Sequence, residues 1–305
     1  MKLQKIWIYF RRALPFLLIA ALLLALLFFP REKEQETVEA TRIIRIWNVD
    51  TFEGGKGSRT AFLRSTAREY EKKHNGVYFL VTNYTLEGAE EAFYRGELPD
   101  MLSFGIGLWV YAERSLPLPY SFAGGSMGSE TLAVPWCRGR YALFSLTDDF
   151  EAEGTTAISV GGSNLSSVAA ELAGIDGEEA ESTAAYTGFL SGKYRYLLGT
   201  QRDVCRFQIR GVQVYERALS GYNDLYQVIS VFSQEKREDC LAFLAYLRSA
   251  DVQSGLDSIG MLPVTGDESE RTVSVFSDAS ALENLRGLAR QNGDGKNLDK
   301  FLKTI

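Results

Sequence analysis

Residues that could perform catalysis are few in this sequence. Histidine occurs once, at His74, beside Asn75 and Gly76 where a predicted helix ends. A histidine there contacts the last carbonyl groups of its helix more often than it serves as a base. A serine nucleophile would depend on this one histidine, and no G-x-S-x-G segment accompanies it. The pair Asp148 and Asp149 lies in an acidic loop and is most simply solvated, and a hydrolase using paired acids is kept as an alternative. The sequence predicts a protein that is not an enzyme.

Metal and nucleotide sites are also disfavoured. One histidine cannot form a histidine cluster, and the three cysteines are far apart, without metal-ligand spacing: Cys137, Cys205 and Cys240. The segment FEGGKGSRT follows a predicted strand, as a nucleotide-binding loop does, but Gly57 separates Lys56 from Ser58. We therefore expect no metal and no cofactor, and cysteines that are small buried residues. Ser58 is expected either to cap a helix or to belong to a loop that faces a ligand.

The aromatic residues are more informative. Trp47, Trp109 and Trp136 each fall at the end of a predicted strand or at a bend. Indole rings in a cleft stack on the apolar face of a sugar, while nearby polar groups bind its hydroxyls. The alternative is that the rings only cap the hydrophobic cores. Both interpretations are open at this point.

Charge is distributed unevenly along the 305 residues. Five of the 33 basic residues lie within the first 31 positions, which contain no acidic residue. The rest of the chain carries 28 basic and 39 acidic residues, without a basic patch. Nucleic-acid binding requires clustered lysine and arginine to neutralise phosphates, so this class of function is disfavoured.

The N-terminal region predicts attachment to a membrane. Residues 1–12 are a basic segment, expected in the cytoplasm, and residues 13–30 begin with an uncharged run that is 17 residues long. At 1.5 Å per residue the run extends about 25 Å, near the short end of what spans a bilayer. We expect a retained single-pass anchor with the body on the extracytoplasmic face, and a cleaved signal is the alternative. Residues 31–42 are a charged tether.

The elements that position these residues alternate between strands and helices. Strands are predicted at 43–49, 77–84 and 101–104, with helices at 60–73 and 87–94 between them. This βαβαβ order predicts a parallel sheet covered by helices. A second group follows, with a strand at 157–160, helices at 163–173 and 178–190, and a strand at 194–198.

Two extended segments connect these groups and predict an α/β protein with two lobes. The first, TLAVPWCRGRYALFSL at 131–146, bends beside Trp136, and the second, YQVISVFS, occupies 226–233. Lobe 1 is expected to consist of 43–130 and 234–305, and lobe 2 of 147–225. A helix at 236–248, another at 249–259 and a largely helical tail from 278 complete the chain. Two lobes joined by crossing segments place a ligand cleft between them.

Several segments together resemble the extracellular solute-binding proteins of ABC importers, particularly the sugar-binding group. The first lobe resembles it in IIRIWNV, FLRSTAREYEKKHNG, VYFLVTNY and LPDMLSFG, and the first crossing in LAVPWCRGRYALFS. FLSGKYRYLLGTQRDVCRF resembles the second lobe, and SQEKREDCLAFLAYLRSADVQSGLDSIGMLPV the returning segment. The segments cover most of 43–264 in the order expected for that family.

The resemblance implies a type II periplasmic-binding-protein fold that closes over a small polar solute, a carbohydrate first, and delivers it to permease subunits. The ligand-facing residues that it implies are Trp47, Asp50, Thr51, Gly105, Trp136, Arg138, Gly199, Thr200, Gln201, Arg202, Tyr222, Asn223 and Asp224. The body is short for this family, and the lipid-anchoring cysteine is missing. The alternative function is a degenerate binding-protein fold that acts as a membrane-tethered sensor or scaffold for a partner protein.

Overall fold

The computed structural model describes residues 41–52, 55–108, 112–264, 270–291 and 296–303, with helical pieces at 14–15, 18–20 and 22. The predicted anchor and tether lie almost entirely outside these residues. Among the residues that are described, no helix combines the length and the apolar character needed to cross a membrane. Residues from Arg42 onward form a compact unit of their own, which contains both predicted lobes.

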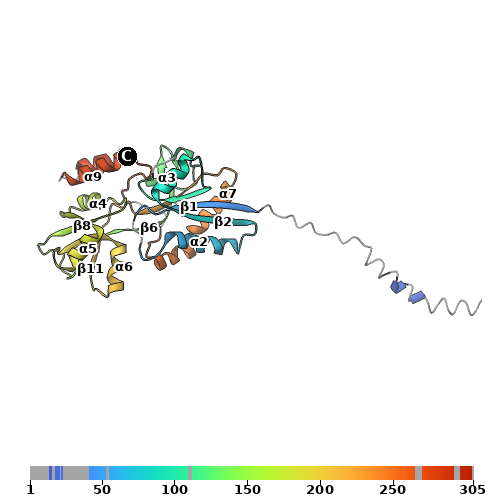
Figure 1. Cartoon of the computed structure of the whole chain (residues 1–305), viewed down its shortest axis with the longest axis horizontal. Coiled ribbons are helices and arrows are strands. Elements are labelled where there is room, and N and C mark those ends of the chain that lie inside the picture. Colours follow the sequence, from blue (N-terminus) through green and yellow to red (C-terminus); the bar gives the residue numbers. More distant parts are fainter. Residues whose placement is uncertain are drawn as a thin grey trace, which may run out of the picture. The chain divides into compact units, whose positions relative to one another are not determined.

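Lobe 1 is built on a five-stranded sheet with the strand order β2-β1-β3-β12-β6. The strands are β1 (Arg42–Val49), β2 (Val77–Tyr84), β3 (Met101–Phe104), β6 (Val134–Arg138) and β12 (Tyr226–Val231). β1 runs parallel to β2 and β3, as the predicted βαβαβ order requires, and β12 is antiparallel to both of its neighbours. The helices α2 (Arg59–Glu71), α3 (Leu86–Tyr94) and α7 (Arg237–Leu247) belong to this lobe (Figure 1).

Lobe 2 is built on a second five-stranded sheet with the order β11-β7-β10-β8-β9. The strands are β7 (Tyr141–Ser145), β8 (Thr156–Val160), β9 (Glu178–Glu181), β10 (Tyr196–Thr200) and β11 (Tyr215–Ala218), and the helices are α4 (Ser166–Leu172), α5 (Ser182–Leu190) and α6 (Gln201–Arg210). The helix predicted at 178–190 therefore begins only at Ser182. Residues 178–181 form β9 instead, because they pair in parallel with residues 157–160 of β8.

The crossings between the sheets are shorter than predicted. The first lies at Gly139 and Arg140, within the predicted segment 131–146, because β6 belongs to one sheet and β7 to the other. The second lies at 219–225, between β11 and β12. The segment 226–233, predicted to be this crossing, instead begins with β12, which pairs with β3 and β6 inside the lobe 1 sheet.

The C-terminal part of the chain contacts both lobes. After α7 come α8 (Ala250–Ser254) and a 3-10 helix, η3 (Gly255–Ile259), both in lobe 1. The last helices, α9 (Ala279–Arg290) and α10 (Lys296–Leu302), pack against α4 of lobe 2 (Figure 1). The prediction that all of 234–305 belongs to lobe 1 is corrected for these two helices, whose apolar residues Leu282 and Leu285 are buried.

Local signals in the sequence account for the ends of α2. The Ser58 hydroxyl accepts a hydrogen bond from the Ala61 N–H at 3.2 Å, so Ser58 is the predicted N-cap. At the other end His74 Nδ1 lies 2.9 Å from the Tyr70 carbonyl, which is the predicted structural role of this histidine. All three cysteines are buried, as predicted, and all have free thiols.

Candidate functional site

The candidate site lies where the carboxyl ends of β1 and β3 in lobe 1 meet a loop of lobe 2. The Ser163 N–H, which follows β8, donates to the Thr51 carbonyl at 2.9 Å. A Cβ atom added at Gly107 would lie 3.0 Å from the Ser163 hydroxyl. In open α/β folds, ligands bind at the carboxyl ends of the strands. The lobes therefore touch at the position where a ligand is expected.

A buried polar network fills the lobe 1 side of this junction. Asn48, Ser103 and Gln227 come from three adjacent strands, and each is completely buried. The Ser103 hydroxyl donates to Asn48 Oδ1 at 2.8 Å, and the Trp136 indole N–H donates to Ser103 Oγ at 3.0 Å. Gln227 Nε2 donates to Ser103 Oγ and to the Val49 carbonyl, both at 3.0 Å. The network fixes the ends of these strands relative to one another.

The same network continues toward α2. Asn48 Nδ2 donates to Thr60 Oγ1 at 2.9 Å and to Asp50 Oδ1 at 3.0 Å. Asp50 in turn pairs with Arg59, whose Nε lies 2.8 Å away and whose side chain is 3% exposed. A second guanidinium nitrogen of Arg59 donates to the Phe52 carbonyl. Arg59 thus holds the loop that follows β1.

Three atoms in this region are buried polar groups without a hydrogen-bond partner among the described residues. They are Thr51 Oγ1, Arg59 Nη1 and Gln227 Oε1. Thr51 lies against Gly105, because a Cβ atom at Gly105 would come within 2.2 Å of the Thr51 hydroxyl. A buried polar atom without a partner is uncommon, because it has lost its hydrogen bonds to water and has formed none within the protein. This cluster of three atoms is therefore the part of the junction whose hydrogen-bonding capacity the described residues leave unused.

On the lobe 2 side, a buried carboxylate is bound by the protein itself. Tyr141 Oη donates to Asp224 Oδ1 at 2.7 Å, and the Leu165 N–H donates to Oδ2 at 3.0 Å. Burial raises the pKa of Asp224 to about 6, although these two hydrogen bonds act in the opposite direction. Burial and the nearby Asp224 also raise the pKa of Tyr222. This carboxylate ties the second crossing to β7 and to the start of α4.

The raised pKa of Asp224 predicts a pH effect on stability. The folded state holds this proton more tightly than the unfolded chain, whose carboxyl has a pKa near 3.8. The wild type should therefore lose stability relative to Asp224→Asn as the pH rises from 4 to 7, by at most about 3 kcal/mol. Urea unfolding of both proteins at each pH measures this difference. A difference that stays constant across the range would contradict the prediction.

The structure brings some of the predicted ligand-facing residues together and separates others. Thr51 and Gly105 lie at the junction. Tyr222, Asn223 and Asp224 occupy the second crossing, where the Asn223 side chain donates to the Gly139 carbonyl at 3.0 Å. Gln201, at the start of α6, accepts from the Arg140 N–H at 2.8 Å and so contacts the first crossing.

The remaining predicted residues are held by other parts of the protein. Arg138 pairs with Glu270 at 3.2 Å. Gly199 and Thr200 end β10, where the Thr200 N–H donates to Asp203 at 3.1 Å. Asp50 is bound to Arg59. Arg202 lies in the first turn of α6, where burial lowers the pKa of its guanidinium.

The two described tryptophans lie within the core of lobe 1. Trp47 is 5% exposed and packs against Tyr84 and Phe93, with ring centroids 4.7 and 5.3 Å away. Trp136 is completely buried, and its ring stacks with that of Phe62 at 6.0 Å. These positions agree with the interpretation that the two rings cap the hydrophobic core, and not with rings that line an open cleft. Trp109 lies outside the described residues.

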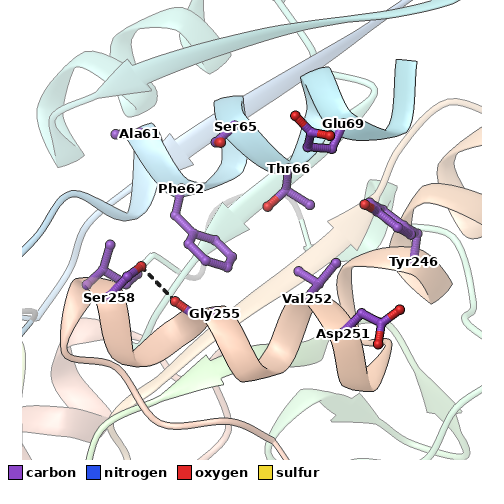
Figure 2. A pocket seen from close by; sticks show the side chains of 11 residues that line it. Ala61, Phe62, Ser65, Thr66, Glu69, Tyr246, Asp251, Val252, Gly255 and Ser258 are labelled. Atoms are coloured by element: carbon purple, nitrogen blue, oxygen red, sulfur yellow. Dashed lines mark hydrogen bonds between the residues drawn. The ribbon is translucent and has the colours of Figure 1, made fainter. Parts of the chain in front are cut away.

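A groove lies on another side of lobe 1. It has a volume of about 520 Å³ and lies between α2 and the segment formed by α8 and η3. Figure 2 shows Phe62 pointing from α2 toward this segment, while Glu69, Tyr246 and Asp251 lie together at one end. None of the groove's lining residues carries a buried polar atom without a partner. The junction is therefore the stronger candidate site.

The residues that build the network were not predicted from the sequence. Asn48, Ser103 and Gln227 are single polar residues inside the apolar strands IIRIWNV, MLSF and YQVISV. A polar residue inside a buried strand requires a partner, so these interruptions were a usable signal. Among the described residues, no group of histidine, cysteine and carboxylate side chains could hold a metal ion.

Comparison with solved structures identifies the fold. The sugar-binding protein MalE from the phytopathogen Xanthomonas citri has a TM-score of 0.62 at 13% identity, over 86% of this chain and 96% of that one. The maltose-maltodextrin binding protein of Alicyclobacillus acidocaldarius has a TM-score of 0.55 at 12% identity, over 86% and 99%. The galacto-N-biose-/lacto-N-biose I-binding protein of the ABC transporter from Bifidobacterium longum has a TM-score of 0.57 at 12% identity, over 86% and 94%.

Sequence comparisons add no closer relative, since no protein-family model and no curated protein matches the chain. At 12 to 13% identity the structural likeness shows the fold. The chain has the two-lobed type II periplasmic-binding-protein fold, as the sequence motifs predicted.

Proposed function

We propose that this chain is an extracytoplasmic solute-binding protein that encloses a small polar solute between its two lobes. The two-lobed fold and the position of the candidate site between the lobes support this function. The proposal also includes the membrane anchor predicted at 13–30, a body on the extracytoplasmic face, and delivery of the solute to the permease of an ABC importer. No catalytic role is proposed for any residue of the junction.

The observation that carries the proposal is the cluster of unpartnered polar atoms at Thr51, Arg59 and Gln227. Each buried polar group left without a partner costs about 1–3 kcal/mol. A solute that accepts from Arg59 Nη1 and donates to Gln227 Oε1 would recover this free energy. The Thr51 hydroxyl can serve in either direction. The cluster therefore favours a solute that has both hydrogen-bond donors and acceptors.

Carbohydrate is the first solute class to test. A sugar presents many hydroxyl groups, each of which is both a donor and an acceptor, and this suits the mixed character of the three atoms. The structural neighbours named above are described as binding sugars, maltose-maltodextrin or lacto-N-biose. An anion is a weaker candidate solute. The Tyr141 hydroxyl and the Leu165 N–H could bind one, but both already donate to the Asp224 carboxylate.

A membrane-tethered sensor or scaffold is the second candidate function. It is favoured by the number of predicted ligand-facing side chains that already bind protein groups. Arg138 binds Glu270, Gln201 binds the backbone of Arg140, and Asp224 binds Tyr141. A junction satisfied in this way would present a fixed surface to a partner protein rather than open for a solute.

Thermal unfolding of residues 42–305 with a panel of sugars, oligosaccharides, amino acids, polyamines and anions separates these functions. A solute at one hundred times its dissociation constant adds about 2.7 kcal/mol to the free energy of unfolding. We expect a sugar to raise the midpoint, and Thr51→Val to weaken its binding about tenfold by removing one hydrogen bond.

The matched control is Thr82→Val, because Thr82 lies in β2 of the same sheet and points to the side opposite Asn83, which bonds to the network. This variant should bind the solute as the wild type does. If no member of the panel shifts the midpoint, solute binding loses its support and the scaffold function gains it. If Thr51→Val binds as tightly as the wild type, the cluster is not the binding site.

A further inference from the structure

Part of one face of the lobe 1 sheet is uncovered. The register pairs Ile43 with Tyr78 and Arg45 with Leu80, so these four side chains point to the same side of β1 and β2. Ile43 is 52% exposed, Tyr78 51% and Leu80 55%. We call these four residues the β1–β2 face.

Such exposure is unusual for parallel strands, whose two faces are normally both covered. The opposite face of the same strands is covered, since Phe79 packs against Phe243 with ring centroids 4.3 Å apart. On the side of the β1–β2 face, α3 covers only the carboxyl half of the strands, through the contact of Phe93 with Trp47. The helix has nine residues and leaves the amino half without a cover.

The free edge of β2 is protected, unlike the face. Glu71 Oε1 accepts from the Phe79 N–H at 2.7 Å, and Arg64 Nε donates to the Val81 carbonyl at 3.1 Å. Both side chains come from α2 and occupy the backbone groups that a partner strand would need. A partner that adds a strand to this sheet is therefore disfavoured, and the occupant must lie on the face.

The position of the face in the chain indicates what covers it. β1 begins at Arg42, and the predicted anchor ends at residue 30. The intervening 11 residues, 31–41, extend at most about 40 Å, so the start of β1 stays close to the bilayer in which the chain is anchored. Ile43 is the second residue of β1, which places the β1–β2 face at the membrane-proximal end of the chain.

The chemistry of the face fits the interfacial region of a bilayer. Isoleucine, leucine and tyrosine supply apolar area with one phenol group, and Arg45 supplies a positive charge beside them. Arg45 and Lys236 both pair with Asp100, at 3.5 and 3.1 Å, so two cations share one carboxylate. Arg42 pairs with Asp239 at 3.3 Å. Arg45, Lys236 and Asp100 together carry one net positive charge, although the body as a whole is acidic.

We propose that the β1–β2 face rests on the surface of the lipid bilayer and so orients lobe 1 relative to the membrane. This inference rests on the membrane anchorage proposed above. It does not depend on which solute the junction binds, because the face lies in the amino half of β1 and the junction lies beyond the carboxyl end of that strand.

A nitroxide spin label tests the proposal in the full chain reconstituted into lipid nanodiscs. The label is attached to Leu80→Cys, and the matched control is Ile209→Cys, an apolar residue of α6 that is 79% exposed. The native cysteines are buried and should not compete for the label. Burial of one large apolar side chain, such as the remaining Ile43, favours the docked state about tenfold, so collisions with a water-soluble nickel complex should fall by a similar factor at position 80. Collisions with oxygen, which concentrates in lipid, should rise there.

Two outcomes would overturn the proposal. One is equal access of the nickel complex to positions 80 and 209 in nanodiscs. The other is protection at position 80 with dipolar coupling between labels, which would show that a second copy of the chain covers the face. Solute binding is measured separately by the shift in thermal unfolding. Failure of the membrane contact is thereby distinguished from failure of the proposed function.

Discussion

Asn48→Ala is expected to lower the free energy of unfolding by about 4 kcal/mol. Asn48 is completely buried and bonds to Ser103, Gln227 and Thr60. Alanine removes their shared partner and leaves buried donors and acceptors that water cannot reach. Each of these groups then costs on the order of 1 kcal/mol or more, and the space left by the amide adds to the loss. Urea unfolding followed by circular dichroism measures the change.

Asn83→Ala is the matched control, because Asn83 belongs to the same network at its exposed end. Its side-chain oxygen accepts from Thr60 Oγ1 at 2.7 Å, but the residue is open to solvent. Water can replace the lost amide there, so we expect a loss of about 1 kcal/mol or less. Similar losses for the two variants would show that the buried part of the network does not hold the strand ends together.

Local sequence signals predicted the parts of the fold that depend on neighbouring residues. Ser58 precedes α2 by one residue and caps it, and His74 lies one turn beyond the end of the helix. The strands β1, β2 and β3 were predicted from β-branched and apolar runs within one or two residues of their ends. In these segments the local preference and the tertiary structure agree.

Segments whose structure depends on distant partners were not predicted correctly. Glutamate favours helices, so EEAE at 178–181 was expected to begin a helix. The segment instead pairs with β8 and forms β9. β11 has the sequence YERA and is exposed at every residue, so no apolar pattern identifies it. It is a strand because β7 offers a free edge. Such pairing cannot be read from the segment itself.

The resemblance and the structure agree on where the candidate site would lie, but not on which residues form it. The resemblance placed Thr51 and Gly105 at the ends of β1 and β3, where the lobes meet. It also suggested Trp47 and Trp136 as ligand-facing, but the side on which a strand residue points changes with each step along the chain. Both rings turned out to face the core. Which polar residues meet across strands depends on the strand order, and this order is a property of the whole fold.

Tyr141→Phe is expected to lower the free energy of unfolding by about 2 kcal/mol at pH 8, where Asp224 is ionised. The Tyr141 hydroxyl donates to this buried carboxylate at 2.7 Å, and the Leu165 N–H donates to its other oxygen at 3.0 Å. Without the hydroxyl, the pKa of Asp224 should rise further above about 6. Below that pH the carboxyl is protonated and needs the donor less. The loss should therefore shrink toward about 1 kcal/mol at pH 5.

Tyr186→Phe is the matched control for Tyr141→Phe. Tyr186 is also buried in lobe 2, at 3% exposure, but its hydroxyl has no hydrogen-bond partner among the described residues. Removing an unpartnered hydroxyl should cost nothing and remove no pH-dependent contribution. Tyr141→Phe, by contrast, removes a donor to Asp224 and an acceptor for the Leu165 N–H, which lies 3.1 Å from the Tyr141 hydroxyl. If both variants unfold alike at pH 8, Asp224 does not depend on Tyr141. If they differ as expected, the second crossing is held to lobe 2 by a charged group, and any opening of the lobes must bend the chain outside this contact.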